Sequence, residues 1–206
     1  MTAHPDSRWR ASPRRLTRLL AGLWLFGAGE ALVVHGALGA SPWTVLAQGV
    51  SVQTPLSIGR ATILISGLVL LLWILLRQRP GLGTLLNAVV IGIAIDVTLA
   101  LVSDDPALPE RWASLLGGIA LVAVGSGFYL GAALGPGPRD GLMTGVHRAT
   151  GRPVAHVRLA IEVTALTAGA LLGGTVGIGT LVFAVSIGPA VHLALRFMSP
   201  IAATEM

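Results

Sequence analysis

Six long apolar segments constrain this chain more than any other feature of its sequence. They cover residues 16–37, 58–77, 82–101, 111–133, 157–174 and 178–197. A helix needs about 20 predominantly apolar residues to cross the hydrocarbon core of a bilayer. Only 11% of the residues are charged, less than half the share of about 25% in soluble domains. The sequence therefore predicts an all-α polytopic membrane protein with six transmembrane helices.

The second half of the chain repeats the first at an interval of 96 residues, the separation of Leu38 and Leu134. Leu38-Gly39 followed by Pro42 recurs as Leu134-Gly135 followed by Pro138, and GLGTL at 81–85 recurs as GIGTL at 177–181. No gap is needed between 15–101 and 111–197. Matched Gly and Pro positions between the spans argue against a chance likeness of apolar helices. We interpret the chain as two copies of a three-helix unit.

The arginines indicate how the two copies are oriented. Because each copy has an odd number of spans, the second copy must enter the bilayer from the opposite side. All basic residues are arginine. With the N-terminus in the cytoplasm, only Arg60 and Arg111 fall outside, as the positive-inside rule requires. We therefore expect a 3+3 inverted-topology repeat in a bacterial cytoplasmic (inner) membrane, with both ends of the chain cytoplasmic.

These patterns divide the chain into five parts. A disordered basic cytoplasmic arm, 1–14, precedes repeat 1, 15–101. An extracytoplasmic linker, 102–110, joins it to the inverted repeat 2, 111–197, and a cytoplasmic tail follows over 198–206.

Residues 38–56 and 134–156 occupy equivalent places after the first span of each copy. Pro near the start and Gly near the end predict a short helix in each. Such a helix can lie in the membrane interface, with Trp43 among the headgroups, or it can be re-entrant. A re-entrant helix would offer its N-terminal N–H groups to an anion. The candidate half-helix or gate residues are Pro42, Pro138, Arg139 and Asp140, although Arg139 and Asp140 can also form a cap and a salt bridge.

Polar groups inside the spans form a candidate transport site, because charges in hydrocarbon are costly and usually face a partner or a cavity. The candidates are Glu30, Asp96, Glu162, Asn87 and His192. Structural alternatives stand beside each of these. Glu30 can be a proton or cation site, or a protonated acid bonded to a neighbouring helix. Glu162 can pair with Arg158 or His192. Asp96, which the 96-residue interval pairs with His192, can reach the interface, and Asn87 can bond between helices.

Several function classes lack support in the sequence. The chain has no cysteine, which excludes disulfides and thiolate metal sites. No nucleic-acid motif, metal-ligand spacing or catalytic triad stands out, so we expect no enzyme, no cofactor, no metal and no nucleic-acid partner. The Gly81-x-Gly83 and Gly177-x-Gly179 pairs lack the strand–turn–helix setting of a nucleotide loop. The expected partners are the lipid bilayer, an unknown small solute or ion and, as a further candidate, a second copy of the chain.

Four runs carry a resemblance to a known family. They are LGPGPRDGLMTG at 134–145, GLGT at 81–84, AIEV at 160–163 and GTVGIGT at 174–180. The chain resembles the YczE/YyaS/YitT-type bacterial membrane proteins from about residue 15 to residue 197, and is most similar to the YczE-like branch. The resemblance implies a multi-pass membrane protein, a class in which transporters are suspected. It implies no catalytic or binding residues.

Two functional interpretations remain open from the sequence. The first is a small secondary transporter or exporter of an unidentified solute, coupled to protons or cations through the buried acids. The alternative is a non-transporting accessory or regulatory membrane protein of another system, favoured by the small size of the chain. A passive channel is a third reading.

Overall fold

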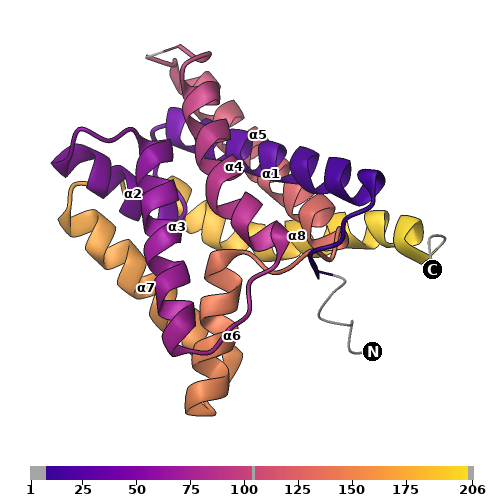
Figure 1. Ribbon diagram of the computed structural model, residues 1–206. Helices are drawn as coiled ribbons and strands as arrows, with labels where there is room; N and C mark the ends of the chain where they lie inside the picture. The colour runs from indigo at the N-terminus through magenta and orange to yellow at the C-terminus, as the bar shows by residue number, and fades with distance from the viewer. Residues whose placement is uncertain (1–7, 104, 204–206) are drawn as a thin grey trace.

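The computed structural model describes residues 8–103 and 105–203. Residues 1–7 of the predicted arm, Asp104 of the linker and residues 204–206 of the tail lie outside the described part. Within it the chain forms helices and no strands: α1 Pro13–His35, α2 Pro42–Gln53, α3 Ile58–Leu75, α4 Leu82–Leu99, α5 Leu108–Gly131, α6 Pro138–Thr150, α7 Val154–Leu171 and α8 Ile178–Ala203. Six of these are long and apolar enough to cross a membrane, and α2 and α6 are the two short helices (Figure 1).

The observed helices differ from the predicted segments mainly at their ends. Helix α1 begins at Pro13, within the predicted arm, because the Ser12 hydroxyl accepts a hydrogen bond from the backbone N–H of Arg15 and caps it. Helix α5 begins at Leu108, within the predicted linker, because Pro109 is tolerated in a first helical turn. Helix α8 continues to Ala203, past the predicted start of the tail. The short helices predicted at Pro42 and Pro138 are confirmed.

The backbone follows the same 96-residue interval as the sequence. Helix α3 spans 58–75 and α7 spans 154–171, while α4 and α8 begin at 82 and 178. Left-handed backbone also recurs: Ala37 has φ 50° and Ala133 has φ 52°, and Gly39 has φ 108° where Gly135 has φ 120°. Because non-glycine residues rarely adopt positive φ, the agreement at the two alanines shows that both long helices end in the same kind of turn.

Helices α1 and α5 pack closely along each other at the centre of the molecule (Figure 1). A Cβ added to Gly22 would lie 2.8 Å from the carbonyl oxygen of Gly125, and one added to Gly118 would lie 2.6 Å from that of Gly29. Small residues of this kind let helix backbones approach each other in a membrane, where burial of apolar surface against lipid gives little drive. The α1–α5 crossing therefore depends on these four glycines.

The segments that follow α1 and α5 close against the opposite half of the chain. The carbonyl oxygen of Leu38 accepts a 2.7 Å hydrogen bond from the N–H of Gly179 at the start of α8. The carbonyl oxygen of Leu134 accepts a 2.9 Å hydrogen bond from the N–H of Gly83 at the start of α4. Each half thus holds the first turn of the other half's last long helix in place.

The two halves differ in how their last two long helices pack. Helix α3 packs along α4, with Gly59 against Gly92. Helices α7 and α8 do not pack along each other in the described structure, and a Cβ on Gly188 would meet nothing within 4 Å. Gly188 stands 96 residues after Gly92, so the two glycines are equivalent in the repeat. Gly92 is tightly packed, whereas Gly188 is open. Helices α7 and α8 are also the least buried of the six long helices.

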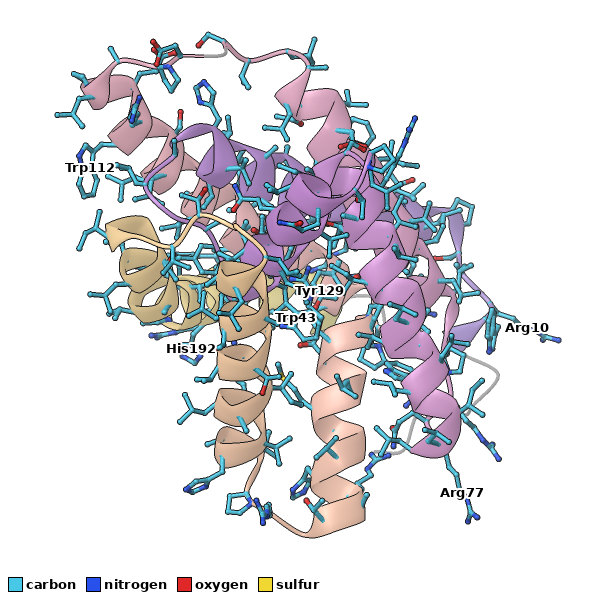
Figure 2. The ribbon with its side chains drawn as sticks, turned by 90° about the vertical axis from the view of Figure 1, so that its left-hand side faces the viewer. Arg10, Trp43, Arg77, Trp112, Tyr129 and His192 are labelled. Atoms are coloured by element: carbon cyan, nitrogen blue, oxygen red, sulfur yellow. The ribbon has the colours of Figure 1, made fainter. Side chains whose placement is uncertain are left out.

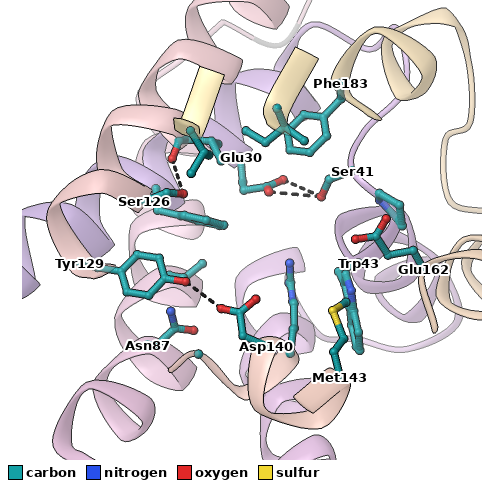
Figure 3. Close-up of a pocket in the computed structure, with 18 of the residues that line it drawn as sticks. Glu30, Ser41, Trp43, Asn87, Ser126, Tyr129, Asp140, Met143, Glu162 and Phe183 are labelled. Atoms are coloured by element: carbon teal, nitrogen blue, oxygen red, sulfur yellow. Dashed lines mark hydrogen bonds between the residues drawn. The ribbon is translucent and has the colours of Figure 1, made fainter. Parts of the chain in front are cut away.

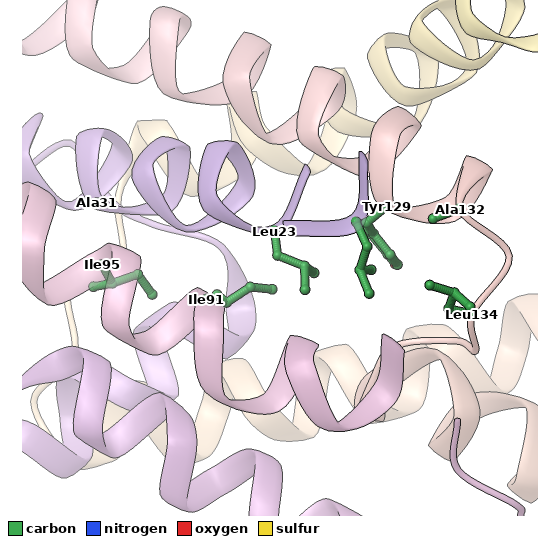
Figure 4. Packing of buried hydrophobic residues seen from close by; sticks show 8 residues of the cluster. Leu23, Ala31, Ile91, Ile95, Tyr129, Ala132 and Leu134 are labelled. Atoms are coloured by element: carbon green, nitrogen blue, oxygen red, sulfur yellow. The ribbon is translucent and has the colours of Figure 1, made fainter. Parts of the chain in front are cut away.

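Apolar side chains divide into a core and an outer surface. One core cluster joins α1, α4 and α5 around Leu23, Ile91, Ile95 and Tyr129 (Figure 4). Large apolar side chains are also widely exposed, such as Leu171 at 84%. On a soluble monomer such a surface would be unusual, whereas it suits contact with lipid tails. Figure 2 places Arg77 and Trp112 at opposite ends of the molecule.

The glycine crossing can be tested with two neighbouring residues on α5. Gly118→Ala places a methyl group against the backbone of α1, and we expect it to reduce stability by about 1–3 kcal/mol through overpacking. Gly117→Ala is the matched control, because a Cβ there meets nothing within 4 Å. Thermal unfolding of the detergent-solubilised protein measures both. Equal unfolding temperatures for the two variants would contradict the close crossing.

Candidate functional site

A cavity of about 500 Å³ lies between the long helices, at the point where α2 and α6 begin (Figure 3). Six of the predicted site residues line it: Glu30, Pro42, Asn87, Arg139, Asp140 and Glu162. They come from α1, α2, α4, α6 and α7, so residues far apart in the sequence meet here. The volume falls in the range of roughly 300–1,000 Å³ that is typical of small-molecule sites.

Glu30 is the most buried acid of the cavity, with 2% of its surface exposed. The hydroxyl of Thr44 donates a 2.7 Å hydrogen bond to its Oε2, and the hydroxyl of Ser41 lies 2.9 Å from the same oxygen. Ser41 precedes α2 as its N-cap residue, yet its side chain makes no capping bond because it is turned toward Glu30. Forgoing such a cap costs about 1 kcal/mol. The first turn of α2 is therefore arranged around this carboxyl group.

Arg139 and Trp43 stand together at the starts of the two short helices. The Cζ of Arg139 lies 5.0 Å from the centre of the Trp43 ring, which is cation–π geometry. Among the described residues, no hydrogen bond or ion pair engages the Arg139 guanidinium. The indole Nε1 of Trp43 is buried and also lacks a partner within the described structure. Two sets of strong donors in the cavity lining are therefore unsatisfied.

The other charged groups of the cavity are paired. The hydroxyl of Tyr129 donates a 2.8 Å hydrogen bond to Asp140 Oδ2 (Figure 3). Arg158 Nε lies 2.9 Å from Glu162 Oε1, one helical turn apart on α7. The sequence analysis left pairing with Arg158 open for Glu162, and the structure contains that pair. Because both side chains are partly exposed, the pair adds little stability, and its importance lies in neutralising charge.

Asp96 and His192 lie away from the cavity and do not meet. Asp96 accepts a 2.6 Å hydrogen bond from the Ser57 hydroxyl and a 2.8 Å hydrogen bond from the N–H of Gly59, so it caps the start of α3. His192 is exposed on α8. The indole N–H of Trp73 donates a 2.9 Å hydrogen bond to the carbonyl oxygen of Pro138, at the start of α6. Asp96 and His192, which the repeat pairs, thus do not line the cavity.

Other pairs related by the 96-residue interval do share the cavity. Eight such pairs line it, among them Glu30 with Ser126, Trp43 with Arg139, and Ser66 with Glu162. Ser41, Thr44, Tyr129 and Trp43 were not among the predicted site residues. Trp43 was detectable in principle, because the interval makes it the partner of the predicted Arg139, directly after the two matched prolines.

The fold and its outer apolar surface define a multi-pass α-helical membrane protein. Residues 13–196 match the family described as "Family of unknown function (DUF6198)", and the chain belongs to this family. It is 42% identical over 193 residues to an "Uncharacterized protein" of Haemophilus influenzae, covering 94% of this chain and 88% of the relative.

Two relatives from Bacillus subtilis confirm the resemblance to the YczE/YyaS-type proteins. The "Uncharacterized membrane protein YczE" is 36% identical over 191 residues, 90% of this chain and 86% of the relative. The "Uncharacterized protein YyaS" is 28% identical over 176 residues, 84% of this chain and 88% of the relative. No solved structure matches the chain.

The Glu30 network makes a stability prediction. Thr44→Val keeps the shape of the side chain but removes the hydroxyl that donates to Glu30, and we expect a loss of about 1–3 kcal/mol because the buried carboxyl group loses one of its two hydroxyl partners. Thr164→Val is the control: its hydroxyl donates to the carbonyl oxygen of Ala160 on an exposed face of α7, where changes stay within about 0.5 kcal/mol. Thermal unfolding in detergent measures both, and equal effects would mean that Thr44 does not support Glu30.

Proposed function

We propose that this protein is a small secondary transporter of an unidentified solute, with Glu30 as its proton-binding group. One observation carries the proposal: a buried acid and an arginine that forms no ion pair with any described residue lie in one cavity, at the starts of two short helices and among six apolar helices. Ionisable groups within a membrane protein usually mark a solute or proton pathway. Broken or short helices that begin at the middle of the protein are typical of transporter binding sites.

The proposed architecture is a 3+3 inverted repeat in which α2 and α6 are re-entrant. The recurrence of helix bounds supports it, as do the reciprocal hydrogen bonds from Gly179 to Leu38 and from Gly83 to Leu134. Burial of Trp43, Thr44 and Val45 on α2 favours a re-entrant helix over one lying among headgroups.

The proposed orientation places both ends of the chain in the cytoplasm, in a bacterial inner membrane. The α3–α4 and α6–α7 connections lie at the lower end of Figure 1, and the α4–α5 connection lies at the upper end. Arg77 and Arg152 belong to the lower connections and Asp105 to the upper one. Under the positive-inside rule, the lower end is cytoplasmic.

Unlike packing of equivalent helices supports a mechanism of alternating access. The α3–α4 pair is closed through Gly59 and Gly92, whereas the cavity extends between α7 and α8, where it is lined by Glu162 and Gly188. In inverted repeats, exchanging the conformations of the two halves gives the state open to the other side. In the proposed exchange α7 closes onto α8 while α3 leaves α4, which releases Asp96 from the start of α3.

The surroundings of Glu30 suit a group that gains and loses a proton. Hydroxyl groups both donate and accept, so Ser41 and Thr44 can satisfy Glu30 in either protonation state. The charged and titratable groups that share its cavity are Tyr129, Arg139, Asp140, Arg158 and Glu162. Of these, Arg139 is the cation that acts most strongly on Glu30. A proton on Glu30 would therefore remove one of the negative charges that act on Arg139.

The alternating-access proposal predicts unequal reactivity at two equivalent positions. The chain has no cysteine, so an introduced thiol is unique. Ala184→Cys places a thiol on the exposed, cavity-lining face of α8, whereas Ala88→Cys, 96 residues earlier, places it at a buried position on α4. We expect a water-soluble maleimide to modify the first much faster. Equal rates of modification would contradict unlike packing of the two halves.

Transport itself is tested in proteoliposomes with a panel of radiolabelled organic solutes, with and without an imposed pH gradient. We expect Glu30→Gln to lose accumulation driven by the gradient while keeping exchange of solute across the membrane, because its carboxamide cannot carry a proton. Glu110→Gln, at the exposed start of α5, is the control and should behave as the wild type. Absence of flux across the panel, with a stoichiometric protein partner on purification, would instead favour an accessory role.

A further inference from the structure

We propose that Arg139 and Trp43 form a subsite for the carboxylate of a small organic monoanion. The inference rests on the proposed function only in treating the cavity as the place where the solute binds. It goes further by naming the chemical class of the solute and the two side chains that would recognise it.

The cavity lining contains strong donors that have no acceptor among the described residues. Trp43 is 8% exposed and lines the cavity, and its indole N–H has no partner in the described part of the chain. Leaving a buried donor unsatisfied costs about 1–3 kcal/mol. Arg139 stands over the same ring with its guanidinium free of hydrogen bonds to described residues. A single acceptor bound beside the Trp43 ring would satisfy both side chains.

The starts of the two short helices also lack side-chain caps. The first-turn N–H groups of a helix have no intrahelical acceptor, and side chains usually cap them. Ser41, the N-cap of α2, is bonded to Glu30 instead, and Gly137, the N-cap of α6, has no side chain to offer. Both residues line the cavity. Two uncapped N-termini with their positive dipole ends therefore lie beside the unsatisfied side chains.

The charged groups of the cavity indicate the charge of the solute. Arg158, the other cavity cation, is paired with Glu162, so with Glu30 protonated Arg139 is the cavity cation that has no ion-pair partner among the described residues. The carboxylates of Glu30, Asp140 and Glu162 would repel a dianion. The planar fork of a guanidinium fits a carboxylate in a bidentate manner.

The apolar part of the cavity wall indicates an organic body. Phe26, Met143 and Phe183 line it together with the Trp43 ring. Such surfaces favour a carbon skeleton over a hydrated inorganic ion, since burying them against a charged hydration shell gains little.

The test is equilibrium binding to the purified full-length protein in detergent. The probes are propionate, butyrate and phenylacetate, their uncharged amides, and inorganic phosphate and chloride at the same concentrations. Thermal stabilisation and quenching of tryptophan fluorescence report binding. We expect at least one carboxylate to bind while its amide and the inorganic anions do not, because only the carboxylate is both an anion and an organic molecule of the right size.

Variants identify the subsite. Arg139→Gln should weaken carboxylate binding roughly tenfold or more, the loss expected for a charge-assisted hydrogen bond. Trp43→Phe keeps a ring below Arg139 and removes only the N–H, so it should weaken binding by roughly threefold to tenfold and serves if Arg139→Gln does not fold. Arg148→Gln is the control, because Arg148 lies at the exposed end of the same helix and contacts Gln78.

Three results would overturn the subsite: no carboxylate of the panel binds, amides or inorganic anions bind equally well, or binding survives both Arg139→Gln and Trp43→Phe. Failure of transport would be distinct from these. Carboxylate binding without flux would leave the subsite standing and remove the transporter, whereas flux of a solute that carboxylates do not inhibit would do the reverse.

Discussion

The close crossing of α1 and α5 determines where everything else in the molecule can lie. Gly22, Gly29, Gly118 and Gly125 bring the two backbones into contact, an approach that larger side chains would prevent. Glu30 follows Gly29 directly and Ser126 follows Gly125. The crossing therefore carries both side chains to the wall of one cavity. Helices α4 and α8 pack on its two sides, and their first turns are held by Leu134 and Leu38 of the opposite half.

Much of this framework follows from the sequence because it depends on length, apolarity and backbone conformation. The six long helices and the two short ones lie where apolar runs, prolines and glycines predicted them, with shifts of a few residues at the ends. Those shifts come from residues at the helix starts. Because Ser12 caps α1 and Pro109 is tolerated in the first turn of α5, both helices begin before their apolar segments. The interval of 96 residues is also visible in both the sequence and the turns at Ala37 and Ala133.

The site was only partly predictable, because the 96-residue interval shows which residues are equivalent in the two halves but not how close together they lie. The repeat pairs Asp96 with His192 as clearly as it pairs Trp43 with Arg139. Asp96 caps α3 and His192 is exposed, whereas Trp43 and Arg139 are in contact. Which pair lies near the centre depends on how α2 and α6 fold back toward α1 and α5. That is a property of tertiary packing, and no local pattern in either helix records it.

Equivalent cavity positions that hold a polar residue carry unlike chemistry, and this difference bears on function. The residue equivalent to Glu30 is Ser126, the residue equivalent to Glu162 is Ser66, and the residue equivalent to Arg139 is Trp43. A cavity made of identical halves would place like charges next to each other, at a cost that rises as water is excluded. Divergence removes that repulsion and leaves one acid held by hydroxyls and one guanidinium that forms no ion pair within the described part of the chain. A protein that served only to support its own fold would gain by pairing those two groups directly, so their separation across a cavity is the strongest physical reason to regard it as a binding site.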